Sequence, residues 1–452
     1  MLAPALAALL AGCATLPANL NRRSPRNTPP RPIVYGAHGP LSVAQSERII
    51  KRLQAQSGAT DLLHRHLAVE EALSASPLVA GNKVTLLVDG PATFKAMFDA
   101  IANAEHTVNI ETYIINDDAL GKRLARLLIK KRAAGVTVNL MYDGFGSRDT
   151  PAGYFDRLRA AGVHVVEYHP INPLKGGSLA TLNNRDHRKL VIVDGRVAFT
   201  GGINISAVYL PPQQRTPASK DSARLWRDTD VEIRGPVVSR FQKLFLTHWQ
   251  NHGGPALPAQ KYLPHLHRAG SQVVRALGSR AGEPQPQIYA TLLSAINSAQ
   301  DSIEITNAYF APNQAFVDAL MAAARRGVQV ELILPAHSDV PVVQAAGRAY
   351  YGELLRAGVK IYERRGVILH AKSVVIDGVW STVGSSNLDW RSFLHNDEVN
   401  AVVLGRAFGR QMQAQFRRDL RHSKRITLWH WRRRSVWQRI KESFLRLWAW
   451  WF

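Results

Sequence analysis

One spacing of residues occurs twice in this chain and constrains it more than any other feature. In each copy a lysine follows a histidine by two residues, and an aspartate follows the same histidine by seven. The two copies are His187, Lys189 and Asp194, and His370, Lys372 and Asp377. A single histidine–lysine pair is common in any protein, whereas a matched pair of such patterns indicates a duplicated functional element.

A glycine and an asparagine extend both copies. Gly201 and Gly384 each follow the aspartate by seven residues, and Asn204 and Asn387 each follow the glycine by three. The two copies agree at five positions, which chance repetition does not explain. The chain therefore contains two related half-sites.

The residues after each histidine predict a strand. Both copies contain a run of β-branched residues, and an Asp-Gly pair predicts the turn that ends it. On a strand, residues two apart project from the same face. We therefore expect His187 and Lys189 to lie together, and His370 and Lys372 to do the same.

Apolar periodicity predicts alternating strands and helices around both copies. Strands are expected at 84–90, 108–115 and 136–142, with helices at 91–104 and 120–134. The same order returns with helices at 288–299 and 315–326 and strands at 302–306 and 328–334. Such alternation is typical of an α/β fold with a largely parallel sheet. The repeat length of about 190 residues indicates two duplicated domains and excludes a short solenoid repeat.

Composition and periodicity divide the chain into five parts. We expect an apolar N-terminus and Pro-rich tether, a helical lead-in, two duplicated domains and a basic tail. Their bounds are 1–40, 41–80, 81–265, 266–420 and 421–452. Residues 250–286 are rich in Gly, Pro, His and Gln and are predicted to connect the two domains.

The N-terminus carries the only cysteine of the chain, Cys13. A lone cysteine excludes a disulfide framework and a cysteine-based metal site. The preceding Leu10-Ala11-Gly12 resembles the end of a bacterial lipoprotein signal, which would make Cys13 a lipid-modified residue. No Lys or Arg precedes the apolar run, so a truncated signal stays open as an alternative.

The tail at 421–452 combines aromatic and basic residues. It holds six of the ten tryptophans, which are Trp429, Trp431, Trp437, Trp448, Trp450 and Trp451. From Val436 the apolar positions follow helical spacing, with basic residues opposite. This pattern predicts an amphipathic helix lying on an anionic membrane surface, and the alternative is a helix packed on the protein's own core. The net charge of +23 also favours anionic partners.

An acid follows each half-site. Asp228 and Glu398 both lie seven residues before a glycine, in strand-like segments. Either acid can hold an imidazole by hydrogen bonding to one ring nitrogen. The sequence leaves open whether each acid serves the histidine of its own half or of the other.

Two histidines, two lysines and two asparagines suit chemistry on a phosphodiester. Ammonium and amide groups stabilise the phosphate oxygens and the added charge of the transition state. One neutral imidazole attacks phosphorus, and the other protonates the leaving alkoxide. We expect neither a metal nor another cofactor, because the lysines supply the positive charge.

The paired motifs resemble those of the phospholipase D superfamily. Longer segments, among them NNRDHRKLVIVDGRVAFTGGINIS and VGSSNLDWRSFLHNDEVNAVV, are similar to the bacterial cardiolipin synthase branch. The resemblance implies two α/β/α domains related by a pseudo-twofold axis, with the active site at their interface. It implies that His187 is the nucleophile and His370 the general acid/base. The implied reaction joins two phosphatidylglycerol molecules into cardiolipin and releases glycerol.

Three alternatives remain at this stage. A lipid hydrolase of the same superfamily would give phosphatidic acid, and the motifs do not distinguish it from a transferase. A nuclease suits the basic charge, but the Trp-rich tail and the lack of a base-stacking pattern disfavour nucleic acid. A non-catalytic binder is disfavoured by the intact His, Lys and Asn pairs. The oligomeric state is left open.

Overall fold

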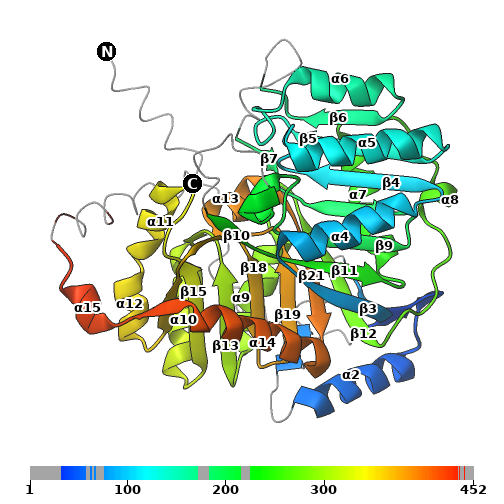
Figure 1. The fold of residues 1–452 in the computed structure, drawn as a ribbon. Helices are drawn as coiled ribbons and strands as arrows, with labels where there is room; N and C mark the ends of the chain where they lie inside the picture. Colours follow the sequence, from blue (N-terminus) through cyan, green and yellow to red (C-terminus); the bar gives the residue numbers. More distant parts are fainter. Residues whose placement is uncertain are drawn as a thin grey trace, which may run out of the picture.

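The computed structural model describes residues 32–57, 62–63, 66–67, 76–171, 183–214, 224–435, 437 and 442. Within them the chain forms two α/β halves that lie against each other (Figure 1). Cys13 and nearly all of the tail helix predicted from Val436 fall outside the described residues.

The first half alternates strands and helices as predicted. Its strands are β3 (Leu78–Val88), β4 (Thr107–Thr112), β5 (Thr137–Asp143), β6 (His164–Tyr168), β7 (Arg185–Asp186), β8 (Leu190–Val193), β9 (Val197–Gly201), β10 (Leu225–Arg227) and β11 (Thr229–Arg234). Its helices are α4 (Asp89–Ala102), α5 (Ala119–Ala133), α6 (Ala152–Ala160), α7 (Val238–Asn251) and α8 (Ala259–Tyr262), with 3-10 turns η3 (Ala207–Tyr209) and η4 (Pro212–Gln214).

The second half repeats this order. Its strands are β12 (Gln272–Ser279), β13 (Ser302–Asn307), β14 (Phe310–Ala311), β15 (Gln329–Pro335), β16 (Lys360–Arg364), β17 (Val367–Leu369), β18 (Lys372–Ile376), β19 (Trp380–Gly384), β20 (Leu388–Asp389), β21 (Asn396–Leu404) and β22 (Ser423–Ile426). Its helices are α9 (Gln287–Ser298), α10 (Gln314–Arg325), α11 (Pro341–Arg348), α12 (Tyr351–Arg356), α13 (Trp390–Leu394), α14 (Arg406–Arg421) and α15 (Leu428–Arg432).

The main strands form one continuous sheet with mirrored halves. In the first half the hydrogen-bonded order is β6-β5-β4-β8-β9-β11-β3, and in the second it is β12-β21-β19-β18-β13-β15-β16. The two halves join where β3 pairs antiparallel with β12. Strands β4, β5 and β6 are mutually parallel, as are β13, β15 and β16. This mirrored order confirms the duplicated α/β fold.

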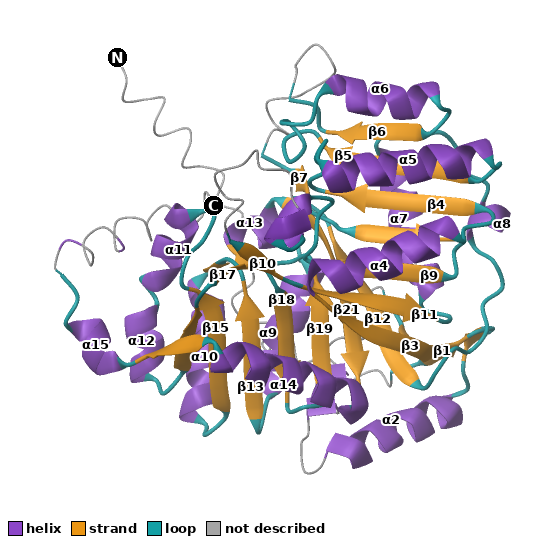
Figure 2. Ribbon diagram, viewed as in Figure 1, coloured by secondary structure: helices purple, strands orange, loops and turns teal. Residues whose placement is uncertain are grey.

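Helices cover both faces of the sheet (Figure 2). In the first half α4, α5 and α6 pack on one face, and α7 packs on the other. Phe241, Phe245 and Trp249 of α7 are buried in a core that also contains Val274 and Val399 of the second half. Because this apolar core draws on both halves, the interface between them is part of the fold itself.

Three details differ from the sequence-based expectations. The predicted connection at 250–286 contains β12, a central strand. Its short apolar run does not stand out in the sequence, because Gly and Pro residues flank it. The end of the predicted tether forms β1 (Val34–Gly36) and β2 (Gly39–Pro40), which are followed by α2 (Val43–Ser57). His187 and Lys189 precede strand β8 instead of lying in it.

No helix among the described residues is both long enough and apolar enough to cross a membrane.

Candidate active site

Parallel pairing between the halves brings an acid to each histidine. Strand β7 pairs with β21 so that Asp186 lies opposite Asp397. The backbone amide of His187 then donates to the carbonyl of Asp397 at 2.9 Å. As a result Nδ1 of His187 lies 2.9 Å from Oε1 and 3.0 Å from Oε2 of Glu398. The nucleophile candidate of the first half is therefore held by an acid of the second.

The second histidine is placed by the converse arrangement. Strands β10 and β17 pair so that Arg227 lies opposite Leu369. The amide of His370 donates to the carbonyl of Arg227 at 2.8 Å, and Nδ1 of His370 lies 2.7 Å from Oδ2 of Asp228. Each acid thus serves the histidine of the other half. With Nδ1–H donated to a carboxylate, Nε2 of each ring keeps its lone pair for chemistry.

Both histidines are buried, and burial disfavours their charged form. Burial and the neighbouring Lys189 and Lys372 hold the pKa of His187 well below its usual range. Burial and Lys372 also lower the pKa of His370, whereas Asp228 opposes that shift. The imidazole of His187 is therefore held in its neutral form more firmly than the imidazole of His370.

The two lysines lie beside the histidines, as their spacing predicted. Nζ of Lys189 donates to the carbonyl of His187 at 2.8 Å, and Nζ of Lys372 donates to the carbonyl of His370. Burial lowers the pKa of Lys189 to about 7 and that of Lys372 to about 8. A bound phosphate would favour their charged forms, because opposite charge counteracts desolvation.

The two asparagines take different contacts. Oδ1 of Asn204 accepts from the amide of Ile114 at 3.2 Å, and its Nδ2 donates to the hydroxyl of Tyr209 at 3.2 Å. Oδ1 of Asn387 is buried without a hydrogen-bond partner among the described residues. Asn204 reaches His370 through Tyr209, whose hydroxyl is 3.3 Å from Nδ1 of that ring, whereas the backbone amide of Asn387 donates to the hydroxyl of Ser392 at 3.1 Å.

Asp194 and Asp377 lie at the far end of their strands from the histidines. Seven extended residues span roughly 20 Å. The carboxylate of Asp194 accepts from the amides of Glu105, His106 and Thr107. Asp377 accepts in the same way from residues 300–302. Both aspartates have positive φ, 52° and 51°, and both tie the turn after their strand to a neighbouring loop, so the structure does not bring them to the histidines.

Sequence reasoning missed several residues around the histidines. Tyr209 and Ser392 each follow a site asparagine by five residues, and each contacts the site. This shared offset is a signal that the sequence did contain. The ring of Tyr113 packs edge-on to His187 with centroids 5.0 Å apart, and Trp226 lies 5.2 Å from His370. Nothing in their spacing marked these two aromatic residues.

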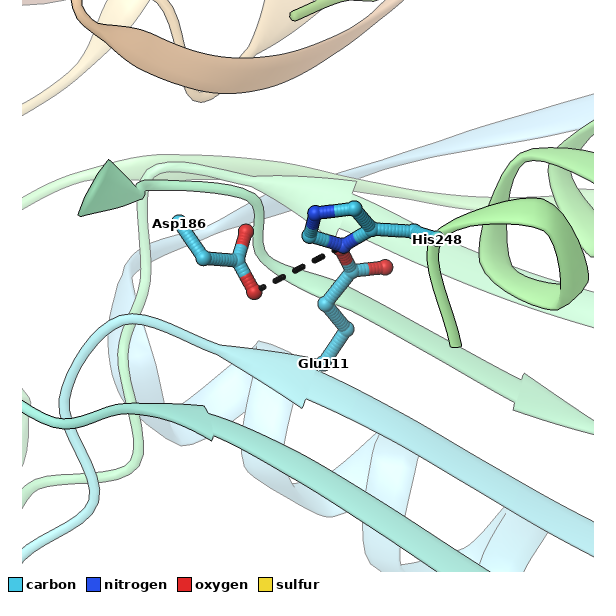
Figure 3. Close-up of side chains that lie close together, drawn as sticks. All are labelled: Glu111, Asp186 and His248. Atoms are coloured by element: carbon cyan, nitrogen blue, oxygen red, sulfur yellow. Dashed lines mark hydrogen bonds and ion pairs between the residues drawn. The ribbon is translucent and has the colours of Figure 1, made fainter. Parts of the chain in front are cut away.

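A buried cluster of charged groups includes Asp186, the residue before His187 (Figure 3). Ligand atoms of Glu111, Asp186 and His248 lie within 4.8 Å of one another. Nδ1 of His248 is 2.6 Å from Oε1 of Glu111, and the guanidinium of Arg188 is 3.6 Å from the same oxygen. Neighbouring carboxylates outweigh burial and raise the pKa of His248 to about 10. We interpret the cluster as an ion-pair network, because Arg188 and protonated His248 supply its positive charge.

Two ion pairs join a long helix of each half, α7 and α14, to the other half. His248 of α7 lies 3.4 Å from Asp397, the residue before Glu398. Asp419 of α14 lies 2.8 Å from Arg227, the residue before Asp228. Each pair fixes the backbone next to an acid that holds a histidine. These contacts explain physically how the two strand pairings are kept in register.

Comparison with known proteins identifies the family to which this site belongs. The family described as "Cardiolipin synthase, PLD-like domain" matches residues 97–249 and 292–420. The chain belongs to this family. The two matched segments contain the two half-sites, in agreement with the phospholipase D resemblance of the sequence.

Bacterial members of the family are similar over most of their length. The chain is 34% identical over 401 residues to a cardiolipin synthase of Geobacillus thermodenitrificans, covering 88% of this chain and 77% of the relative. It is 37% identical over 359 residues to cardiolipin synthase A of Pseudomonas entomophila, covering 78% and 72%. A solved phosphatidylserine synthase of Haemophilus influenzae shares the fold, with a TM-score of 0.64, 13% identity and coverage of 84% and 96%.

Proposed function

We propose that this chain is a phosphatidyltransferase that joins two phosphatidylglycerol molecules into cardiolipin and releases glycerol. The observation that carries the proposal is the crossed pair of imidazoles, each held at Nδ1 by a carboxylate of the other half. The named activity of the family members supports the choice of substrate.

In the first step, Nε2 of His187 attacks the phosphorus of one phosphatidylglycerol. The bond between phosphorus and the glycerol oxygen breaks, and His370 gives its Nε2 proton to that oxygen. His187 suits attack because its lowered pKa keeps the ring neutral. Asp228 opposes the lowering of the pKa of His370, and the phosphodiester anion favours the protonated ring further.

In the second step, the terminal hydroxyl of another phosphatidylglycerol attacks the phosphohistidine. His370 accepts the hydroxyl proton, and the phosphorus–nitrogen bond to His187 breaks. Lys189 and Lys372, with the amides of Asn204 and Asn387, stabilise the phosphoryl oxygens in both transition states. Asp194 and Asp377 act on the fold of the strand ends, since their carboxylates hold backbone amides.

Lipid analysis of a simple reaction tests this function. Purified protein is incubated with phosphatidylglycerol and a chelator, and the products are separated by mass. Cardiolipin and glycerol in equal amounts are expected. Phosphatidic acid without cardiolipin would instead identify a hydrolase. The His187→Ala and His370→Ala variants are expected to be inactive, and full activity of either variant would refute the mechanism.

We further propose that the protein is peripheral to an anionic bacterial membrane through its C-terminal tail. Trp429 and Trp437 are 60% and 80% exposed, and the guanidinium of Arg433 lies 4.3 Å over the ring of Trp429. Trp431 is packed against Tyr351 and anchors α15 to the second half. Exposed tryptophan next to arginine suits the boundary between lipid headgroups and acyl chains.

Vesicle binding of tail variants tests the membrane proposal. Deletion of 425–452 would remove part of β22 and the core residue Trp431, so point variants are the better choice. The Trp429→Ala/Trp437→Ala protein should bind phosphatidylglycerol vesicles more weakly than the unchanged chain does. Unchanged binding would refute the proposal. A lipid anchor at Cys13 is a separate proposal, and palmitate labelling that persists in Cys13→Ser would exclude it.

A further inference from the structure

The tyrosines beside the two catalytic histidines have different charged neighbours. On the His187 side, burial and Asp143 raise the pKa of Tyr113 to about 12, and three guanidinium groups, of Arg391, Arg185 and Arg148, oppose the rise. On the other side, burial, Asp339 and Asp389 all raise the pKa of Tyr309. Arginines therefore offset the carboxylate beside Tyr113, whereas Tyr309 has carboxylate neighbours at Asp339 and Asp389.

Tyr309 connects the second side to the histidine that moves the proton. Its ring lies edge-on to His370 with centroids 6.0 Å apart, and Nζ of Lys372 is 5.9 Å from the ring centroid. The hydroxyl of Tyr309 donates to Oδ2 of Asp339 at 2.7 Å. Asp339 is thus held one side chain away from His370.

Asp339 is exposed and lies in the loop between β15 and α11. The carboxyl end of a parallel strand is where α/β folds commonly bind ligands. Apart from the bond to Tyr309, the described residues give its carboxylate one long hydrogen bond, from Ser338 at 3.4 Å. Among the described residues, no ion pair within 4.0 Å neutralises it. Acceptor positions on both oxygens therefore remain available.

A free carboxylate is an unexpected group beside a phosphate site. The carboxylate repels the anionic phosphodiester. Hydrogen-bond donors of the substrate offset this cost when they bind the carboxylate. The glycerol headgroup has no charge and carries neighbouring hydroxyl groups, which are such donors. In the proposed mechanism the glycerol oxygen exchanges its proton with His370, so the glycerol lies on the side of Asp339.

We propose that Asp339, oriented by Tyr309, is a subsite for the glycerol hydroxyl groups of the leaving and the incoming headgroup. This inference rests on the proposed transferase function. The subsite favours a diol-bearing acceptor over water or a simple alcohol in the second step.

A competition between two acceptors tests the subsite. The full-length protein is incubated with phosphatidylglycerol and 1-propanol, which has a three-carbon chain with one hydroxyl. Cardiolipin and phosphatidylpropanol both arise from the same phosphohistidine, so their ratio reports the acceptor step alone. This ratio does not depend on the amount of folded enzyme in a preparation.

The Asp339→Ala variant should lower the ratio of cardiolipin to phosphatidylpropanol by about tenfold or more, the size expected for lost hydrogen bonds to a charged group. Tyr309→Phe should lower the ratio less, because the carboxylate remains. Asp318→Ala, which removes an exposed carboxylate from α10, is the matched control and should leave the ratio unchanged. An unchanged ratio in Asp339→Ala would overturn the subsite. Failure of the unchanged chain to make either product would instead overturn the transferase function.

Discussion

Replacement of Asp228 by asparagine tests the crossed arrangement directly. In the native site, Nδ1–H of His370 faces Oδ2 of Asp228 at 2.7 Å. The other oxygen accepts from the amide of Thr229 at 2.7 Å, so the asparagine oxygen would take that position. Its NH2 group would then face Nδ1 of His370. Two N–H donors cannot pair, and the imidazole would respond by moving its proton to Nε2.

A proton on Nε2 disables the ring for both of its roles. A neutral Nε2–H is a poor acid for the leaving glycerol and offers no lone pair to the incoming hydroxyl. General acid/base catalysis contributes about 10²- to 10⁴-fold, so we expect kcat to fall by that factor. The fold should be nearly unchanged, because the substitution is almost isosteric and keeps the Thr229 hydrogen bond.

The assay is the initial rate of glycerol release from phosphatidylglycerol, with a thermal unfolding curve for each protein. Asp230→Asn, two residues further along the chain and within β11, is the matched control. Burial raises the pKa of Asp230 to about 8, so its carboxyl group is already largely neutral, and its contact is with the amide of Ile203. A full rate in Asp228→Asn, or an equal loss in the folded control, would refute the reasoning.

Three further outcomes follow from the same geometry. First, kcat/KM should rise with pH as His187 loses its proton below pH 6.5, and it should fall in two stages, near pH 7 as Lys189 becomes neutral and near pH 8 as Lys372 becomes neutral. Lys189→Arg should move the first stage to higher pH and Lys372→Arg should move the second, and a stage that does not move belongs to another group. Second, Asp194→Ala should lower the free energy of unfolding by about 2–4 kcal/mol, because three amide contacts are lost at a residue with positive φ. Urea denaturation measures this loss, and a stable but inactive protein would place Asp194 in the chemistry. Third, Asp419→Ala should lower the free energy of unfolding by about 3 kcal/mol, because buried Arg227 loses its shorter ion pair at 2.8 Å and keeps only the one with Asp89 at 3.4 Å. An unchanged melting temperature would contradict that role.

Much of the fold could be predicted because the signals were local. The helices at α5 and α10 and the strands at β4, β5, β13 and β15 agree closely with the apolar periodicity. Strand β12 was missed because its central place in the sheet depends on pairing with β3 and β21, which no local pattern encodes.

The residues of the site show the same contrast between local signals and long-range pairing. His187, Lys189, His370 and Lys372 carry a repeated spacing, so the sequence identified them. The partner of each histidine was undetermined, because Glu398 reaches His187 through a pairing between β7 and β21 that spans 211 residues. Long-range register depends on tertiary packing, which the local patterns of a single sequence do not reveal.

The crossed acids also set when activity can begin during protein synthesis. His187 leaves the ribosome 211 residues before Glu398, which is roughly 10 to 40 seconds at ordinary rates of elongation. Throughout that interval the first histidine has no acid to fix its tautomer, and the second histidine has not been aligned. A nascent chain at the membrane therefore cannot cleave the lipids around it. The enzyme becomes active only when its second half has folded onto its first.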